Sequence, residues 1–445
     1  MASMPLSLLD EKEDNSQQGE IRKEKKFDFI SKLMQPSVFP HLVDYVQWQA
    51  ETRQSPNTES LYSKIPDRAP VSINLDPTSA CNYQCPHCVD KDILNTGEKY
   101  DYDKLAKRLG MMYERGLKSV IIIGGGEPTL YREFEDLVGF AKEREIQVAI
   151  VSNGTGMEKI ANVAHLLGEK DWIRLSLDSA SEEKFQAMHL PKGKMIPLKQ
   201  KNKVPITLEQ ICENVRELKR VYPELNMGFS YIVTWPGARI NKSYIEENIE
   251  EIVPTAYRAR ESRFSFLSLK AFLERDEEHN AERIGLDKKR SDYRDVIDRI
   301  RGKIDEAKRI ENDKFKVAVS SNLRVLLEGE EERYTKQPKE CHMSYFRQVL
   351  GIRGVVICPG YRAEASAKIS DKEAYLNEAE NGSNASLIKL AEKIKTFDAS
   401  KICRNVVCMY NDANWFIENL IEEAVNNPSS LAKLKPGEEL HDYFL

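Results

Sequence analysis

Short apolar segments alternate with amphipathic segments through residues 71–272, and this alternation limits the fold of the chain more than any other feature. The apolar segments are rich in β-branched and aromatic residues, whereas the segments between them carry apolar residues at helical spacing. Strands that alternate with helices pair in parallel, because each helix returns the chain to the same edge of the sheet. The pattern predicts an α/β fold whose six strands form a partial (β/α)6 TIM-like barrel. The predicted strands are VSINL, SVIIIG, QVAIVS, WIRLSL, GFSYIVT and FSFLSLKAF.

The chain of 445 residues is longer than a usual single domain, and its composition changes along its length. A charged leader with few apolar residues is expected to be mobile. Beyond the barrel, a strongly charged stretch predicts surface helices, and four cysteines mark a further unit. The expected parts are a mobile leader (1–26), a helical N-terminal extension (27–70), the barrel with its charged helical linker (71–312), a C-terminal cysteine-bearing domain (313–425) and a tail without chemical signal (426–445).

Charge and hydropathy argue against two classes of function. No apolar run approaches the roughly 20 residues that span a bilayer, and the N-terminus lacks the basic and apolar regions of a secretory signal. A net charge of -5 gives no global basic excess to neutralise phosphates. We therefore expect a cytoplasmic protein that binds no membrane, and the acidic balance disfavours nucleic-acid modification while leaving room for a local basic site.

Three cysteines follow the first predicted strand in the segment CNYQCPHC: Cys81, Cys85 and Cys88. Their spacing would form one buried stripe on a helix. Because Pro86 disfavours helix at the preceding residue, a loop at the carboxyl end of the strand is predicted instead. Three thiolates leave one iron of a 4Fe-4S cluster open, whereas four would close it. A zinc site completed by His87 is the alternative, although adjacency to Cys88 is a poor spacing for two ligands of one tetrahedral ion.

Polar and glycine residues also follow the next three predicted strands. GGGEP, after the second strand, allows close approach of the backbone at its glycines and presents Glu127 at the rim. The third and fourth strands end in VSNGT and RLSLDS, so their polar residues are expected at the same end of the barrel. Taken singly, each could belong to a turn or a helix cap. These residues are Ser152, Asn153, Ser176 and Asp178.

The CNYQCPHC loop resembles the C-x3-C-x2-C motif of the radical SAM superfamily, and GGGEP is similar to that family's GGEP motif. The resemblance covers residues 71–270. It implies that the three cysteines hold a 4Fe-4S cluster whose open iron binds the amino and carboxylate groups of S-adenosylmethionine (SAM), with His87 packed near the adenine. Further contacts to SAM are implied for Gly125, Gly126 and Glu127 at the methionine ammonium, and for Ser152, Asn153, Ser176 and Asp178 at the ribose and the methionine carboxylate.

The same resemblance implies the type of reaction. One electron from a reducing partner such as flavodoxin or ferredoxin would cleave SAM to methionine and a 5′-deoxyadenosyl radical, which abstracts hydrogen from a substrate. The resemblance implies no particular catalytic residue, and none is assigned.

Four more cysteines lie beyond the predicted barrel: Cys341, Cys358, Cys403 and Cys408. Around Cys358, FRQVLGIRGVVICPGYR predicts a short hairpin with Gly354 at its turn and Cys358 on the returning strand. Four thiolates can close either a zinc site or a 4Fe-4S cluster, and their spacing does not decide between them. The arrangement resembles the SPASM/twitch extensions of radical SAM enzymes, which implies one auxiliary 4Fe-4S cluster that transfers electrons. The remaining cysteine, Cys212, is expected in the core.

A lysine-rich segment, FQAMHLPKGKMIPLKQKNKVPITL, follows the fourth predicted strand. A run of like charges is usually a solvated loop. Its expected place at the open face of the barrel supports a second hypothesis, in which His189, Lys192 and Lys194 bind an anionic substrate.

The leading interpretation is a radical SAM enzyme that oxidises or epimerises a small molecule, such as a sugar or an anionic compound. An alternative is a peptide maturase that forms cross-links or epimers, although residues 27–64 contain no strand-rich segment typical of a leader-binding module. The third interpretation is a non-catalytic scaffold stabilised by metal in both cysteine sets.

Overall fold

One ten-stranded sheet organises the computed structural model, which describes residues 28–189, 206–240, 243–275, 282–362, 364–375 and 384–445. Its strands lie in the order β11 (Lys316–Val319), β8 (Phe266–Ala271), β5 (Met227–Val233), β4 (Trp172–Ser176), β3 (Gln147–Ser152), β2 (Ser119–Ile122), β1 (Ser72–Leu75), β12 (Arg347–Gly351), β13 (Gly354–Val356) and β14 (Lys368–Ser370). Neighbours from β11 to β12 pair in parallel, and the last two pairings are antiparallel. The predicted α/β fold, with six parallel strands in chain order, is confirmed.

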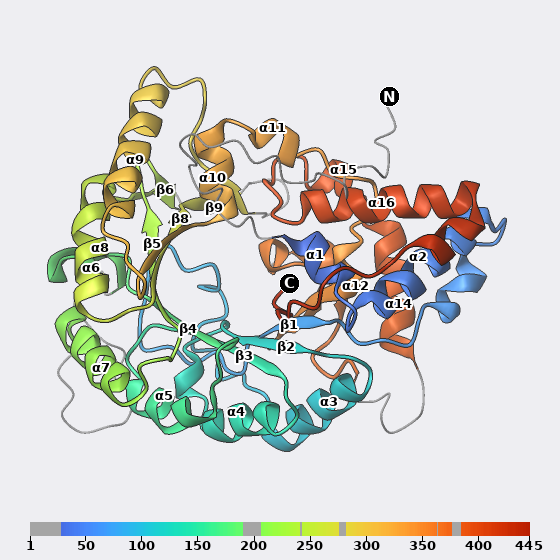
Figure 1. The fold of residues 1–445 in the computed structure, drawn as a ribbon, viewed down its shortest axis with the longest axis horizontal. Helices are drawn as coiled ribbons and strands as arrows, with labels where there is room; N and C mark the ends of the chain where they lie inside the picture. Colours follow the sequence, from blue (N-terminus) through green and yellow to red (C-terminus); the bar gives the residue numbers. More distant parts are fainter. Residues whose placement is uncertain (1–27, 190–205, 241–242, 276–281, 363, 376–383) are drawn as a thin grey trace.

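Helices cover the outer, convex side of the curved sheet (Figure 1). They are α3 (Tyr102–Glu114), α4 (Phe134–Lys142), α5 (Met157–Val163), α6 (Glu182–His189), α7 (Leu208–Val221) and α8 (Ile252–Glu261). In α7, Thr207 caps the first turn by accepting a hydrogen bond from Gln210 N, and the apolar face is buried. Cys212 lies on that face with no exposed surface, so its predicted place in the core is confirmed.

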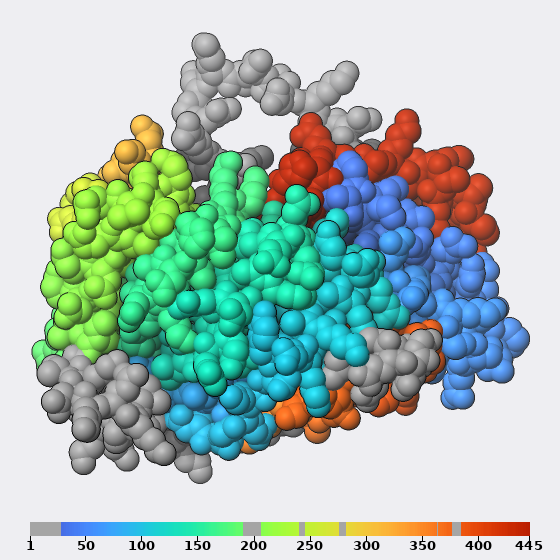
Figure 2. Space-filling view, turned by 90° about the horizontal axis from the view of Figure 1, so that it is seen from below, coloured from blue at the N-terminus to red at the C-terminus, as the bar shows by residue number. Residues whose placement is uncertain are grey.

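Helices from the two ends of the chain pack together beside the barrel. The N-terminal ones are α1 (Phe29–Met34), α2 (Phe39–Gln54) and the 3-10 turn η2 (Glu59–Lys64), and the C-terminal ones are α14 (Ala385–Thr396), α15 (Ala399–Ile402) and α16 (Asn411–Asn426). Arg53 on α2 makes two hydrogen bonds, of 2.9 and 2.7 Å, to the carboxylate of Glu418 on α16. Figure 2 shows the blue N-terminal and red C-terminal surfaces in contact on one side of the molecule.

The charged stretch after β8 differs from its prediction as a purely helical linker. Its first part forms an antiparallel pair, β9 (Leu273–Arg275) with β10 (Glu282–Ile284), and only then does α9 (Tyr293–Lys308) begin. Opposite charges face each other across the pair, with Arg275 3.9 Å from Glu282 and Arg283 3.9 Å from Glu274. Such cross-strand charge pairs stabilise two short paired strands, although the charged composition of the segment alone predicts helix.

Several short elements complete the described chain. They include the pair β6 (Arg239–Ile240) and β7 (Ser243–Tyr244), the helices α10 (Ser321–Glu328), α11 (Glu331–Tyr334) and α12 (Met343–Phe346), and further 3-10 turns. The leader predicted over residues 1–26 lies outside the described residues. Within the described residues, no helix is both long and apolar enough to cross a membrane.

The C-terminal segment covers the amino ends of the central strands. Ser119 Oγ, at the start of β2, donates to Tyr443 O at 2.7 Å, and Gln147 Nε2, at the start of β3, donates to His441 O at 2.6 Å. The ring of Phe444 packs on that of Trp172, the first residue of β4, with centroids 5.5 Å apart. The C-terminal segment therefore blocks the amino ends of these strands. A ligand would have to reach the carboxyl ends, which is where parallel barrels carry their active sites.

Replacing Phe444 with alanine is expected to destabilise the protein by about 3 kcal/mol, because the ring is almost fully buried against Trp172. Denaturant unfolding measures the loss. Val221→Ala is the control, because Val221 is 58% exposed and its truncation should change stability by no more than about 0.5 kcal/mol. Equal losses in the two variants would contradict a packing role for the C-terminal segment.

Candidate active site

The three cysteines of CNYQCPHC lie in an irregular loop directly after β1: Cys81, Cys85 and Cys88. The loop is tied to the glycine-rich loop after β2, since Glu127 N donates to Ala80 O at 2.8 Å. A Cβ on Gly126 would lie only 2.2 Å from Ala80 O, so only glycine permits this close approach. Asn95 fixes the other side of the loop by accepting from Cys81 N at 3.0 Å.

Burial makes these three thiols costly to ionise without a metal. It raises the pKa of Cys81 to about 12, that of Cys88 to about 11, and that of Cys85 well above its usual value. The thiols also lie close enough for the charge of one to raise the pKa of another. A group of buried thiols becomes thiolate readily when a metal supplies the positive charge.

The three sulfurs are not gathered as closely as the ligands of a single zinc ion would be. Among the described residues, the one group of three ligand atoms within 4.8 Å of one another is Cys85, His87 and His189, so the three cysteine sulfurs do not all lie that close. Tetrahedral zinc, with zinc–sulfur bonds of about 2.3 Å, would bring its sulfurs within about 3.8 Å of one another. In an iron–sulfur cluster each cysteine binds a different iron, which requires wider spacing.

Glu127 is buried beside the cysteine loop and joins two strand ends. Its Oε1 accepts from Thr129 N at 3.1 Å, from Thr129 Oγ1 at 2.7 Å and from Ser152 Oγ at 2.7 Å, and its Oε2 accepts from Asn153 N at 2.7 Å. Burial raises the pKa of Glu127, and these hydrogen bonds oppose the rise. Asn153 Nδ2 also donates to Asn82 Oδ1 at 2.8 Å. Three residues that the sequence assigned to SAM therefore lie together beside the cysteine loop.

Asp178 lies just past the end of β4 and faces two imidazoles. Its Oδ1 accepts from Ile232 N at 2.9 Å, and its Oδ2 is 3.6 Å from Nε2 of both His87 and His189. Burial raises the pKa of Asp178, but the contacts with His87 and with the second imidazole lower it more, so the pKa lies below its usual value. Ser176 is half-buried at the end of the same strand, so His87, Ser176 and Asp178 come from neighbouring segments at the carboxyl edge.

His189 lies beside the cysteine loop and is 2% exposed. Its Nδ1 is 3.2 Å from Cys85 Sγ, and its Nε2 is 3.1 Å from Leu177 O. Burial lowers the pKa of His189 to about 4, so the ring is neutral at pH 7 and carries no charge for an anion. Its role toward substrate stays a prediction. The other two residues of that hypothesis, Lys192 and Lys194, lie outside the described residues.

A buried ion cluster, which sequence reasoning missed, links the cysteine loop to the C-terminal region. Arg362 Nη2 donates to Asp76 Oδ2, and its Nε is 3.4 Å from Asp90 Oδ1. The side chains of Arg362, Asp76 and Asp90 are 9%, 2% and 10% exposed. Burial lowers the pKa of Arg362, but the two carboxylates outweigh it and keep the pKa above its usual value. The one available sequence signal was proximity, since Arg362 follows Cys358 by four positions and Asp90 follows Cys88 by two.

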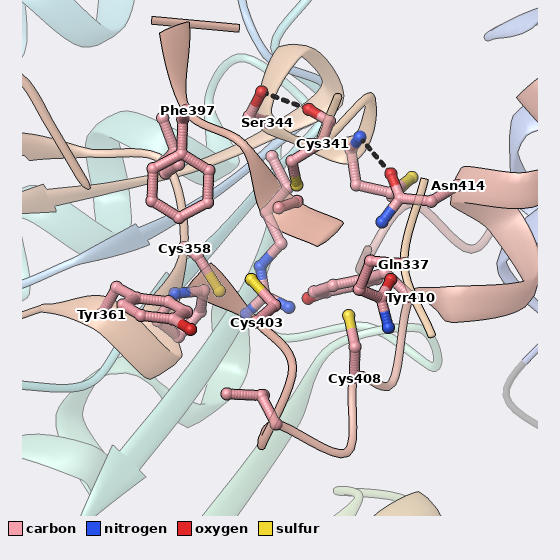
Figure 3. Close-up of a pocket in the computed structure, with 16 residues that line it drawn as sticks. Gln337, Cys341, Ser344, Cys358, Tyr361, Phe397, Cys403, Cys408, Tyr410 and Asn414 are labelled. Atoms are coloured by element: carbon pink, nitrogen blue, oxygen red, sulfur yellow. Dashed lines mark hydrogen bonds between the residues drawn. The ribbon is translucent and has the colours of Figure 1, made fainter. Parts of the chain in front are cut away.

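The four C-terminal cysteines line one hollow and turn their sulfur atoms toward it (Figure 3): Cys341, Cys358, Cys403 and Cys408. Burial raises the pKa of each thiol, that of Cys341 to about 12. The predicted hairpin is confirmed as β12 and β13, with Gly354 at φ 140° at its turn. Cys358 does not lie on the returning strand, however, but two residues after β13, where the chain enters a short 3-10 turn.

Arg362→Gln is expected to destabilise the protein by about 3–5 kcal/mol, because it leaves two buried carboxylates without their countercharge. Thermal or denaturant unfolding under anaerobic conditions measures the loss. Arg353→Gln is a matched control near the turn of the β12–β13 hairpin: Arg353 is 52% exposed and 3.7 Å from Glu98, and such a surface pair contributes less than about 1 kcal/mol. If both variants lose the same stability, the ion cluster does not hold the loops together.

Residues 75–252 match the model of the radical SAM superfamily. The chain is 34% identical over 112 residues to the S-adenosylmethionine-dependent nucleotide dehydratase of Thermoplasmatales archaeon (strain ISO4-H5), which is 25% of this chain and 39% of that protein. It is 31% identical over 123 residues to the mycofactocin maturase MftC of Mycolicibacterium smegmatis, 26% of this chain and 29% of that protein. The crystal structure of Streptococcus suis SuiB aligns with a TM-score of 0.49 and 15% identity, over 70% of this chain and 65% of that one. The chain thus spans less than half the length of the two curated relatives.

The matched segment contains the cysteine loop, the glycine-rich loop and the ends of β3 and β4, which the structure brings together at one edge of the sheet. The cofactors of the superfamily are a 4Fe-4S cluster and SAM, and the buried, widely spaced thiols of the loop suit such a cluster. Residues 75–252 are therefore identified as a radical SAM domain.

Proposed function

We propose that this radical SAM enzyme removes hydrogen from a small-molecule substrate and that the outcome is oxidation, with epimerisation as the nearest variant. The observation that carries the proposal is the hollow lined by four cysteines beside the barrel. Four thiolates close the coordination of a 4Fe-4S cluster, so this donor set favours electron transfer over binding of substrate. When bound, the first cluster and SAM supply a carbon radical, and an electron acceptor nearby favours loss of one hydrogen atom, one proton and one electron by the substrate.

The spacing of the C-terminal cysteines supports a cluster over zinc in that hollow. Among the described residues, no three of these four sulfurs lie within 4.8 Å of one another, whereas the sulfurs around one zinc ion would. The N-terminal set would be Cys81, Cys85 and Cys88, and a small electron carrier such as flavodoxin or ferredoxin would supply the reducing electron.

Glu127 is the residue best placed to receive the ammonium group of SAM. Its Oε1 is saturated by three hydrogen bonds, whereas Oε2 accepts one hydrogen bond, from Asn153 N, among the described residues. A carboxylate oxygen has room for a second donor. Ser152 and Asn153 therefore hold the carboxylate in place, while Gly125 and Gly126 bring the backbone close. We assign His87, Ser176 and Asp178 to the adenosine and carboxylate groups of SAM. The reason is that the loop after β1 and the end of β4 bring these residues to the same edge of the sheet.

A second candidate function is maturation of a peptide or protein. It is favoured by the 31% identity to a protein named mycofactocin maturase, although that match covers only 29% of the relative. The two candidates differ in the size of the substrate and not in the radical chemistry.

Anaerobically reconstituted protein is expected to contain about eight iron and about eight sulfide per chain, as two 4Fe-4S clusters require. Cys85→Ser should lose about four iron together with reductant-dependent formation of 5′-deoxyadenosine, and Cys403→Ser should lose the other four. Cys212→Ala is the control, because this buried cysteine belongs to neither set and its replacement should leave the iron content unchanged. Zinc without sulfide in the wild type would contradict the proposal.

Deuterium transfer distinguishes the two candidate substrates. Deuterated pools of small metabolites and of peptides are each incubated with reduced enzyme and SAM, and 5′-deoxyadenosine is analysed by mass spectrometry. Transfer from small metabolites is expected, since the hydrogen removed from the substrate ends on the 5′ carbon. Transfer from the peptide pool alone would replace the small-molecule proposal with the maturase one.

A further inference from the structure

Two cationic side chains lie on the concave face of the sheet, away from the covering helices. Along β4 the burial alternates, so that Ile173 and Leu175 pack in the core while Arg174 between them is half-buried on the other face. The same alternation along β8 places Lys270 on that face, next to the buried Leu269. Because side chains on a strand alternate between faces and the helices occupy the convex side, both cations point to the inside of the barrel (Figure 1).

Neither cation is neutralised by the part of the chain that the structure describes. Arg174 Nε is buried without an acceptor, and the guanidinium lies 5.3 Å from the ring centroid of Trp172, a contact that leaves its N–H groups unpaired. Lys270 has no hydrogen bond or ion pair with any described residue. A buried donor without an acceptor costs about 1–3 kcal/mol, which a bound ligand can recover.

The nearest carboxylate, Asp178, is already engaged. It accepts from Ile232 N and faces the imidazoles of His87 and His189. After burial, the charge of Arg174 is the largest influence that lowers the pKa of Lys270, and Asp178 opposes it. Burial and Arg174 together hold the pKa of Lys270 well below its usual value, so an anion bound beside this lysine would favour its charged form.

Along the strands, a row of serine hydroxyl groups lies between the depth of Arg174 and that of Lys270. Ser176, Ser230 and Ser268 are in register across β4, β5 and β8. Arg174 is two residues before Ser176, about 7 Å deeper in the barrel, and Lys270 is two residues beyond Ser268. The row of three serines therefore separates a deep guanidinium from an ammonium at the level of Asp178, close to the residues assigned to SAM.

We propose that Arg174 and Lys270, with Ser230 and Ser268 of the serine row between them, form a subsite for an anionic group of the substrate, either a carboxylate or a phosphate. The inference rests on the proposed function, because it names the class of molecule from which hydrogen is removed. Guanidinium and ammonium groups recognise both kinds of anion, and charge-assisted hydrogen bonds are strongest in a site of low dielectric. An anion seated there would be anchored inside the barrel, with the remainder of the substrate directed toward the carboxyl edge, where SAM is expected.

Anion binding tests this subsite without requiring turnover. Anaerobically reconstituted full-length protein with SAM bound is titrated calorimetrically with inorganic pyrophosphate and, separately, with malonate. Arg174→Gln and Lys270→Gln should each weaken the tighter probe about tenfold, the loss expected for one charge-assisted hydrogen bond, and Arg174→Lys should restore part of it. Lys316→Gln removes an exposed lysine at the edge of the same sheet and should change the affinity by less than about twofold. The probe that binds more tightly identifies the anion as phosphate or carboxylate.

Three results would overturn the subsite: no binding of either probe to the wild type, unchanged binding to both Gln variants, or an equal loss of SAM affinity, which would assign the cations to the carboxylate of SAM. Circular dichroism of each variant separates lost binding from lost folding, and rescue by Arg174→Lys provides a second check. Formation of 5′-deoxyadenosine by the wild type is measured separately. Its absence would contradict the proposed function, whereas the binding data would still decide the presence of the anion site.

Discussion

The guanidinium of Arg362 between two buried carboxylates is the interaction on which the arrangement of the site depends. Asp76 directly follows β1 and also accepts from Gly124 N at 3.1 Å, while Asp90 follows the cysteine loop and accepts from Gly125 N at 3.3 Å. One side chain from the C-terminal region therefore fixes the end of β1, the exit of the cysteine loop and the glycine-rich loop. Removing any partner would leave a buried charge unpaired, so this contact holds the three segments together.

A second link runs in parallel with the first. Arg347, which lines the four-cysteine hollow, donates through Nη2 to Asn74 Oδ1 at 2.7 Å, and Asn74 lies on β1 two residues before Asp76. Burial lowers the pKa of Arg347 to about 10, so it still carries its charge at pH 7. Arg347 and Arg362 thus connect the region of the four C-terminal cysteines to β1 and to the residue that follows it.

Local patterns in the sequence were enough to predict the six-stranded core, the cysteine loop and the hairpin. Each of these depends on neighbours in the chain: alternation for the strands, Pro86 for the loop, Gly354 for the turn. The contact of Arg362 with Asp76 joins residues 286 positions apart, and no local pattern encodes such a pair. Arg174 and Lys270 did leave a signal, because each interrupts an apolar strand with period two. Their importance could not be recognised until the sheet showed which face is covered by helices.

The C-terminal region is part of the sheet and not an appendage to it. β12 pairs in parallel with β1 from Ser72↔Arg347 to Leu75↔Leu350, and the C-terminal segment fills the amino ends of β2, β3 and β4. Without β12, the edge of β1 would expose unpaired backbone groups next to the cysteine loop. The matched segment 75–252 therefore contains the residues that we propose to bind SAM, but it does not contain the strand that pairs with the edge of β1. For this reason the hollow with the second cysteine set has a fixed position relative to the first, as transfer of an electron between two such sites would require.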